Sequence, residues 1–141
     1  MPLRLIPEIH RATHRIGVHL ARLPGLHLSQ GEAHILAHLA RFGESTISEL
    51  HRAFAHKRST LTSILDRLAA RGLIARITNP LDRREFIVRL TAPGKVLARR
   101  AYRELNALER RALRHLTNGQ LEGFAATLRA LEKASKDPAS S

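Results

Sequence analysis

The residues best suited to bind a polyanion form the tripeptide Asp82-Arg83-Arg84, which lies between two segments of alternating hydrophobicity. A guanidinium group on a protruding loop suits the narrow, electronegative minor groove of DNA. Asp82 stands two residues before Arg84 and can limit its motion through a bidentate ion pair. We therefore predict that Arg84 enters a groove and that Asp82 orients it. Arg83 either contacts phosphate or is simply solvated. The alternative is a surface ion pair that contributes little.

A second candidate set lies near the start of a segment in which Leu61, Ile64, Leu65 and Leu68 recur at helical spacing. The residues left facing outward there are Arg58, Ser59, Thr60, Thr62 and Ser63. Short hydroxyl groups and a helix N-terminus can meet phosphates or base edges, and an arginine can reach guanine or phosphate. We predict a DNA-contacting helix face, with at least one hydroxyl used instead to cap the helix.

The charge supports a polyanionic partner. The chain has 24 Lys and Arg against 12 Asp and Glu, and thirteen of these basic residues lie between Arg52 and Arg103 with only three acidic ones. A concentrated positive field attracts nucleic acid and gives salt-dependent affinity. Arg67 is included among the predicted DNA-binding residues. Arg71, Arg76 and Arg89 are further candidates for backbone contacts, with a solvated position as the equal alternative.

Three capping boxes mark the starts of helices at Ser29, Thr46 and Thr117, each with Glu or Gln three residues later. Helical spacing of apolar residues also predicts helices from about residue 7 to 24, across 61–68, and from 92 toward 116. A short helix followed closely by a second one has the outline of a helix-turn-helix.

The hydrophobic period then changes from 3.6 to 2, which predicts strands over 73–78 and 85–90. The joining segment, residues 79–84, is too long for a tight hairpin and is expected to protrude. The sequence therefore predicts a mainly α fold with a small β-hairpin wing. The outer helices are too apolar to be covered by the middle of the chain alone, which suggests a partner chain.

Three segments together resemble the signature of the MarR (multiple antibiotic resistance regulator) family of winged-helix transcriptional regulators. They are Leu68–Arg76, Asn79–Arg84 and Val88–Gly94, within a helix order that is similar from about residue 8 to 133. One departure is His51, where the family commonly has alanine. Another is the absence of cysteine, which removes the peroxide-sensing branch.

The resemblance implies a single MarR-like domain over 1–141, with a winged helix-turn-helix in 28–92, dimerisation helices in 7–24 and 93–133, and a frayed tail in 134–141. It implies a homodimer that reads a pseudo-palindromic operator in double-stranded DNA and acts as a regulator, usually a repressor. Small aromatic or anionic effectors would release the DNA. The family uses an arginine and an aspartate of the wing as we predict for Arg84 and Asp82.

Nine histidines invite two hypotheses. His10 and His14, like His34 and His38, are spaced to share a helix face. A zinc site would need two further ligands and has no cysteine to supply them, so no metal site and no cofactor are predicted. A metal-responsive regulator remains an alternative. His10, His14 and His38 are instead candidates to line an effector pocket, where their titration near neutrality would make DNA affinity pH-sensitive.

Several classes of protein are disfavoured. The chain has no Gly-x-Ser-x-Gly, no phosphate-binding glycine loop and no carboxylates paired for acid–base chemistry, so we expect no enzyme. The segment without charged residues from Leu23 to Gly31 is far too short to cross a membrane. We expect a cytoplasmic protein. The remaining alternative is a winged-helix module that binds nucleic acid without sequence preference.

Overall fold

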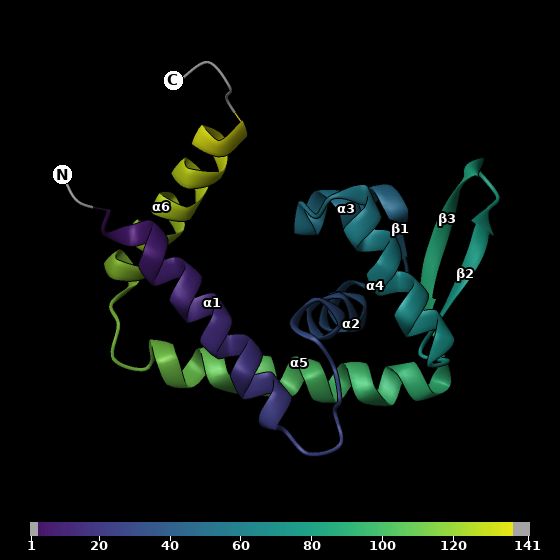
Figure 1. The fold of residues 1–141 in the computed structure, drawn as a ribbon, viewed down its shortest axis with the longest axis horizontal. Helices are drawn as coiled ribbons and strands as arrows, with labels where there is room; N and C mark the ends of the chain where they lie inside the picture. Colours follow the sequence, from purple (N-terminus) through teal and green to yellow (C-terminus); the bar gives the residue numbers. More distant parts are fainter. Residues whose placement is uncertain (1–2, 137–141) are drawn as a thin grey trace. The chain divides into compact units, whose positions relative to one another are not determined.

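Six helices and a three-stranded sheet make up residues 3–136, the part of the chain that the computed structural model describes. The mainly α fold with a β-hairpin wing is as predicted. The elements in chain order are α1 (Leu5–Arg22), α2 (Gln30–Phe42), β1 (Ser45–Thr46), α3 (Ile47–Phe54), α4 (Arg58–Ala70), β2 (Ile74–Asn79), β3 (Asp82–Leu90), α5 (Ala92–Leu113) and α6 (Asn118–Lys136) (Figure 1).

All three capping boxes are formed. Ser29 Oγ accepts from the Glu32 amide at 3.2 Å, and Glu32 Oε1 accepts from the Ser29 amide at 3.1 Å. The same reciprocal bonds join Thr46 with Glu49, and Thr117 with Gln120. Because each box satisfies amides that have no partner inside the helix, it fixes where α2, α3 and α6 begin.

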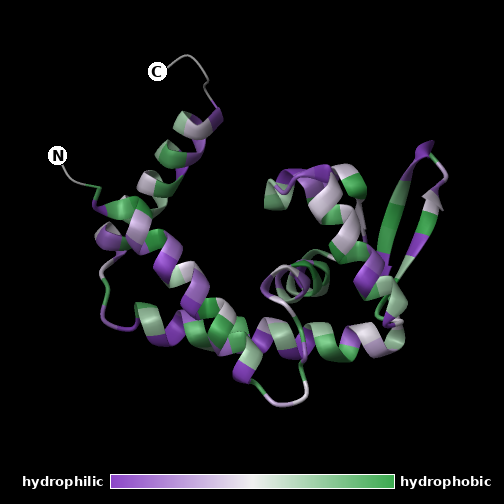
Figure 2. Cartoon of the chain, viewed as in Figure 1, coloured by the Kyte–Doolittle hydropathy of each residue, from purple (hydrophilic) through white to green (hydrophobic). Residues whose placement is uncertain are grey.

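The sheet has the order β1-β3-β2, and both pairings are antiparallel. Along β3, the hydrophilic residues Asp82–Glu85 precede the hydrophobic stretch Phe86–Val88 (Figure 2). Pairing continues as far as Asn79 with Asp82, so only Pro80 and Leu81 lie between the paired positions and the predicted six-residue loop is wrong. Asn79 Oδ1 accepts from the Leu81 amide at 3.0 Å, which tightens the turn. The two-residue strand β1 was too short to be predicted.

Aliphatic side chains from α2, α3, α4 and β3 form the core beneath the helix-turn-helix. Leu36, Leu50 and Leu68 are fully buried. Gly94 allows the start of α5 to pack closely against Leu73 at the base of the wing. A Cβ at this position would collide with the carbonyl oxygen of Leu73. This close packing positions α4 and the hairpin on one rigid support, and α4 runs beside the hairpin (Figure 1).

Two compact units divide the chain, the first ending at Leu105 and the second beginning at Asn106. The predicted winged helix-turn-helix, 28–92, falls within the first unit. In the second unit, no residue of α6 is buried, and Phe124 keeps 56% of its surface exposed. Helix α6 continues to Lys136, three residues beyond its predicted end; residues 137–141 of the predicted frayed tail lie outside the described residues.

Candidate nucleic-acid interface

A groove of about 660 Å³ runs between α3, α4 and the wing. Five of the candidate residues line it, namely Arg58 and Thr62 from α4 and Arg76, Asp82 and Arg84 from the hairpin. Sequence reasoning missed its α3 wall, which includes Ser48, His51 and Arg52. The short amphipathic helix was interpreted only as packing, although Arg52 opens the basic segment. The structure thus brings helix and wing cations together on one concave surface.

On the wing, the Arg84 side chain is 91% exposed and its Nε lies 3.2 Å from Asp82 Oδ1. The Arg84 amide donates to the same oxygen at 3.1 Å. These hydrogen bonds lower the pKa of Asp82, so the carboxylate stays charged. The predicted ion pair is present but uses one carboxylate oxygen, and it is not bidentate. Arg84 therefore has guanidinium donors left for another ligand.

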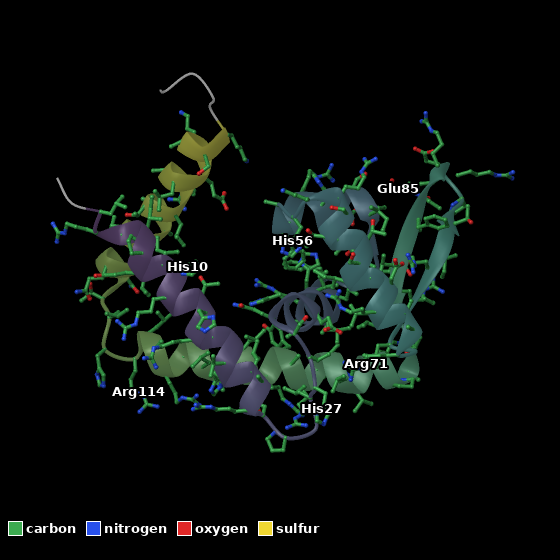
Figure 3. The ribbon with its side chains drawn as sticks, viewed as in Figure 1. His10, His27, His56, Arg71, Glu85 and Arg114 are labelled. Atoms are coloured by element: carbon green, nitrogen blue, oxygen red, sulfur yellow. The ribbon has the colours of Figure 1, made fainter. Side chains whose placement is uncertain are left out.

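A second carboxylate ties the wing to α3. Glu85 Oε1 accepts from the Ser48 amide at 2.8 Å, and this bond lowers the pKa of Glu85 (Figure 3). Ser48 lies in the first turn of α3, where amides have no partner within the helix. The contact joins residues 37 apart, so local sequence patterns carry no signal for it.

The polar face of α4 is exposed, as predicted, but the residue that caps the helix differs from the prediction. Arg58, Ser59, Thr60, Ser63 and Arg67 are all exposed. The N-cap is Lys57, without a side-chain capping bond, so the prediction that one of the hydroxyls caps this helix is wrong. Instead, the Thr62 hydroxyl donates to the Arg58 carbonyl at 2.9 Å. Ser59, Thr60 and Ser63 lie outside the lining of the groove.

Three of the arginines considered as backbone contacts are held by other protein groups. Arg76 pairs with Asp66 at 2.7 Å, and Arg89 pairs with Glu44 at 2.8 Å. Arg71 donates to carbonyl oxygens of the α1–α2 loop, and its role as a candidate backbone contact stays a prediction. The fourth, Arg67, makes no hydrogen bond among the described residues and lies 3.9 Å from Glu32.

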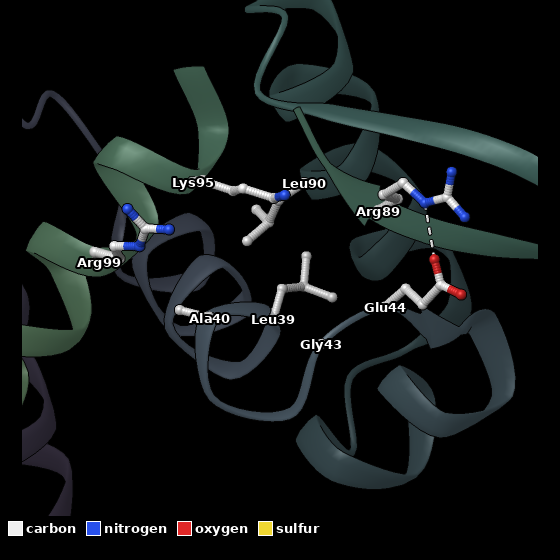
Figure 4. Close-up of a pocket in the computed structure, with 8 residues that line it drawn as sticks. All are labelled: Leu39, Ala40, Gly43, Glu44, Arg89, Leu90, Lys95 and Arg99. Atoms are coloured by element: carbon white, nitrogen blue, oxygen red, sulfur yellow. Dashed lines mark hydrogen bonds and ion pairs between the residues drawn. The ribbon is translucent and has the colours of Figure 1, made fainter. Parts of the chain in front are cut away.

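A smaller pocket of about 350 Å³ lies away from the groove, where α2, β3 and α5 meet (Figure 4). Leu39 and Leu90 form its apolar part, and Lys95 and Arg99 extend over it from α5. The Arg89–Glu44 pair closes one side. The pocket shares no lining residue with the groove.

The three predicted effector histidines lie on two helices, with His10 and His14 on α1 and His38 on α2. His14 lines a shallow hollow on α1 with Arg11 and Arg15, whereas His10 is exposed outside that lining. His38 of α2 packs between aromatic rings, with ring centroids 4.7 Å from Phe42 and 5.3 Å from Phe54. Burial lowers the pKa of His38. No group of three or more metal-ligating side chains occurs among residues 3–136.

Comparisons with known proteins show the fold, and they show a family to which part of the chain is similar. A family model described as the MarR family matches residues 25–85, which include α3, α4 and most of the wing. The uncharacterized HTH-type transcriptional regulator YfiV of Bacillus subtilis is 29% identical over 116 residues, 79% of this chain and 72% of that protein. Over residues 25–85 the chain is therefore similar to the MarR family.

Solved structures of regulators share the fold of this chain. A probable transcriptional regulator from Pseudomonas aeruginosa is 26% identical with a TM-score of 0.71, and the match covers 90% of this chain and 96% of that one. Bordetella bronchiseptica BpsR, in a structure on regulation of its DNA binding by 6-hydroxynicotinic acid, has the same fold. Its TM-score is 0.69 at 21% identity, covering 92% of this chain and 99% of BpsR.

The MarR family and its winged-helix fold are those of DNA-binding transcriptional regulators rather than enzymes. None of the helices in the described part of the chain is long and apolar enough to span a bilayer. The groove between α4 and the wing is therefore the candidate site for duplex DNA.

Proposed function

We propose that this protein is a sequence-specific repressor of the MarR family that binds a pseudo-palindromic operator as a homodimer and is released by a small molecule. The observation that carries the proposal is the shared groove of Arg58, Thr62 and Arg84. Among the described residues, the one ion pair that involves either arginine joins Arg84 to Asp82 Oδ1. Two cations from separate elements, aimed at one concave surface, suit the backbone and grooves of a duplex.

Helix α4 and the wing contact different grooves of the DNA in this proposal. The N-terminal half of α4 enters the major groove, where Arg58 and the exposed hydroxyls of Ser59, Thr60 and Ser63 meet base edges or phosphates. Arg84 enters the neighbouring minor groove, held by Asp82. Arg83 and Arg67 contact phosphates.

The proposed homodimer is supported by large apolar residues that α1 and α6 leave exposed among the described residues. Phe124 of α6 and Leu5 and Ile6 of α1 each expose at least half of their surface. Burying such residues against a second copy removes apolar area from water and sets two wings related by a two-fold axis. That symmetry matches a pseudo-palindromic operator.

Release by an effector is supported by the example of BpsR, whose DNA binding is regulated by 6-hydroxynicotinic acid. In this chain, His10, His14 and His38 remain the candidate residues for an effector pocket. Binding there would have to favour a conformation in which the wings no longer match the operator, since only differential affinity shifts an equilibrium.

The proposed function is tested by fluorescence anisotropy with the DNA upstream of the protein's own gene and with a random duplex of equal length. Both are titrated at two salt concentrations. We expect the upstream duplex to bind at least a thousandfold more tightly. Equal affinity for both duplexes, lost in parallel as salt rises, would instead indicate a module that binds nucleic acid without sequence preference.

A further inference from the structure

Arg71 is the C-cap residue of α4, and its guanidinium group bonds protein oxygens although 36% of the side-chain surface is exposed. Its Nη1 donates to the carbonyl oxygen of His27 at 2.7 Å, and Nη2 lies 3.5 Å from the carbonyl oxygen of Leu26. Both carbonyls belong to the loop between α1 and α2, more than forty residues earlier in the chain. Figure 3 labels Arg71 and His27.

A buried carboxylate holds the arginine from the other side. Glu32 is only 7% exposed, and its Oε2 lies 3.7 Å from Arg71 Nη1. Its Oε1 already accepts from the Ser29 amide in the capping box of α2. Because an ionised carboxylate so far removed from water needs cationic and hydrogen-bonding partners, Glu32 fixes the position of the Arg71 guanidinium.

The loop that receives Arg71 is itself anchored. Leu26 and Leu28, on either side of His27, are buried in the core. His27 has a φ of +49°, a left-handed conformation that is uncommon for a residue with a side chain. A hydrogen bond to its carbonyl therefore constrains a backbone that would otherwise relax. We call the contacts of Arg71 with Leu26, His27 and Glu32 the Arg71 bracket.

We propose that Arg71 is a positioning residue for DNA binding, which sets the orientation of α4 through the Arg71 bracket and makes no contact with phosphate. Its donors are directed at protein carbonyls and a carboxylate, and these hold the C-terminal end of α4 against the loop that leads from α1. The orientation of α4 determines how its N-terminal residues meet the major groove. The inference rests on the proposed function only in taking specific duplex DNA as the ligand.

The chain offers a matched control for this proposal. Arg67 lies one turn earlier on α4 and near the same carboxylate, but it makes no hydrogen bond among the described residues. The variants are Arg71→Lys, Arg71→Gln and Arg67→Gln. Lysine keeps the charge of Arg71 but lacks the planar fork that reaches two carbonyls. A phosphate contact would tolerate lysine, whereas the bracket would not.

The affinity of each variant is measured across a salt series for the tightest duplex that wild-type protein selects from a random library, and for a random duplex. We expect both Arg71 variants to weaken the selected duplex about tenfold, as for the loss of a hydrogen bond to a charged group. The slope of log Kd against log salt and the random-duplex affinity stay unchanged. Arg67→Gln, at a predicted phosphate contact, lowers the slope by about 0.9.

Recovery of wild-type affinity by Arg71→Lys, or a smaller salt slope in Arg71→Gln, would overturn the proposal. A purely structural role would weaken selected and random duplexes equally, which also overturns it. Circular dichroism at the assay temperature verifies that the variants are folded, and Arg71→Lys carries the test if Arg71→Gln is not. Failure of the proposed function gives a different result, because wild-type protein then shows no preference for the selected duplex.

Discussion

Arg84 is the side chain on which the interface depends most. It is 91% exposed at the wing, and its only ion partner among the described residues is Asp82, two residues earlier in the chain. In a free protein such a pair contributes little to stability, so its value lies in presenting the guanidinium in one orientation. A side chain ordered before binding loses less rotamer entropy when it enters a groove.

We predict that Arg84→Ala weakens binding to the selected duplex by about 1–3 kcal/mol and leaves the dimer intact. The loss arises because alanine removes the guanidinium group that Asp82 holds at the groove. Anisotropy titrations measure the affinity, and sedimentation measures the dimer. Arg89→Ala is the control, since Arg89 lies on the same strand but is paired with Glu44 outside the groove. Equal affinities for the two variants would remove Arg84 from the interface.

A second prediction at this scale concerns His34 of α2. Burial lowers its pKa, and the nearby His56 lowers it further, so the folded protein favours the neutral imidazole. The unfolded chain takes up a proton first as pH falls below about 6.5, and folding stability is therefore lost below that pH.

Chemical denaturation between pH 7.5 and 5.5 should show this loss, and His34→Gln should reduce it. His115→Gln, at an exposed position of the chain, is the control and should leave the pH dependence as it is. An unaltered pH profile in His34→Gln would show that protonation of His34 does not limit stability.

Among the elements, the wing is held to α3 by the carboxylate of Glu85. Its negative charge is opposite to that of the arginines in the same groove. Glu85 places a negative group beside the groove that is proposed to receive phosphates, and its oxygen accepts from the Ser48 amide at the start of α3. Its structural role and its electrostatic role therefore act in opposite directions on DNA affinity.

These roles are separated by two substitutions. Glu85→Gln removes the charge but keeps an oxygen that accepts from the Ser48 amide, and we expect it to bind DNA as tightly as wild type or more tightly. Glu85→Ala removes both, and we expect weaker binding because the wing is no longer tied to α3. The same anisotropy titrations apply. Tighter binding by Glu85→Ala would show that the wing needs no such tie.

How much of this could be predicted from sequence depends on how local each interaction is. The capping boxes at Ser29, Thr46 and Thr117 act over three residues, and each predicted its helix start correctly. The turn of the wing was misjudged because Asn79 bonds the Leu81 amide, which allows strand pairing to continue to Asp82. The groove residues on α4 followed from helical periodicity, and those on the wing followed from their charge and spacing between the two predicted strands.

The contacts that position those residues were beyond sequence reasoning. The bond from Ser48 to Glu85 and the bond from Arg71 to His27 join residues 37 and 44 apart. Each depends on where two elements are brought by packing of the core, and no spacing rule connects them. For the same reason, Arg71 was grouped with the exposed arginines although its donors face protein carbonyls.

For the whole molecule, symmetric binding to a pseudo-palindromic operator requires two copies of the chain. We predict a sedimentation mass of about twice 15.8 kDa at micromolar concentration. Phe124→Glu places a charge where α6 exposes an aromatic ring, so it should give a monomer with much weaker operator binding. Lys133→Glu, at a polar position of the same helix, is the control. A dimer that survives Phe124→Glu would exclude this face of α6 from the interface.

The central claim is that the groove between α3, α4 and the wing receives duplex DNA in two symmetric copies. Hydroxyl-radical footprinting of the selected duplex, with wild-type protein and with Arg84→Ala, tests it most directly. We predict protected tracts related by two-fold symmetry, and loss in the variant of the minor-groove protection farthest from the centre. A footprint that is asymmetric, or that Arg84→Ala leaves unchanged, would contradict the account.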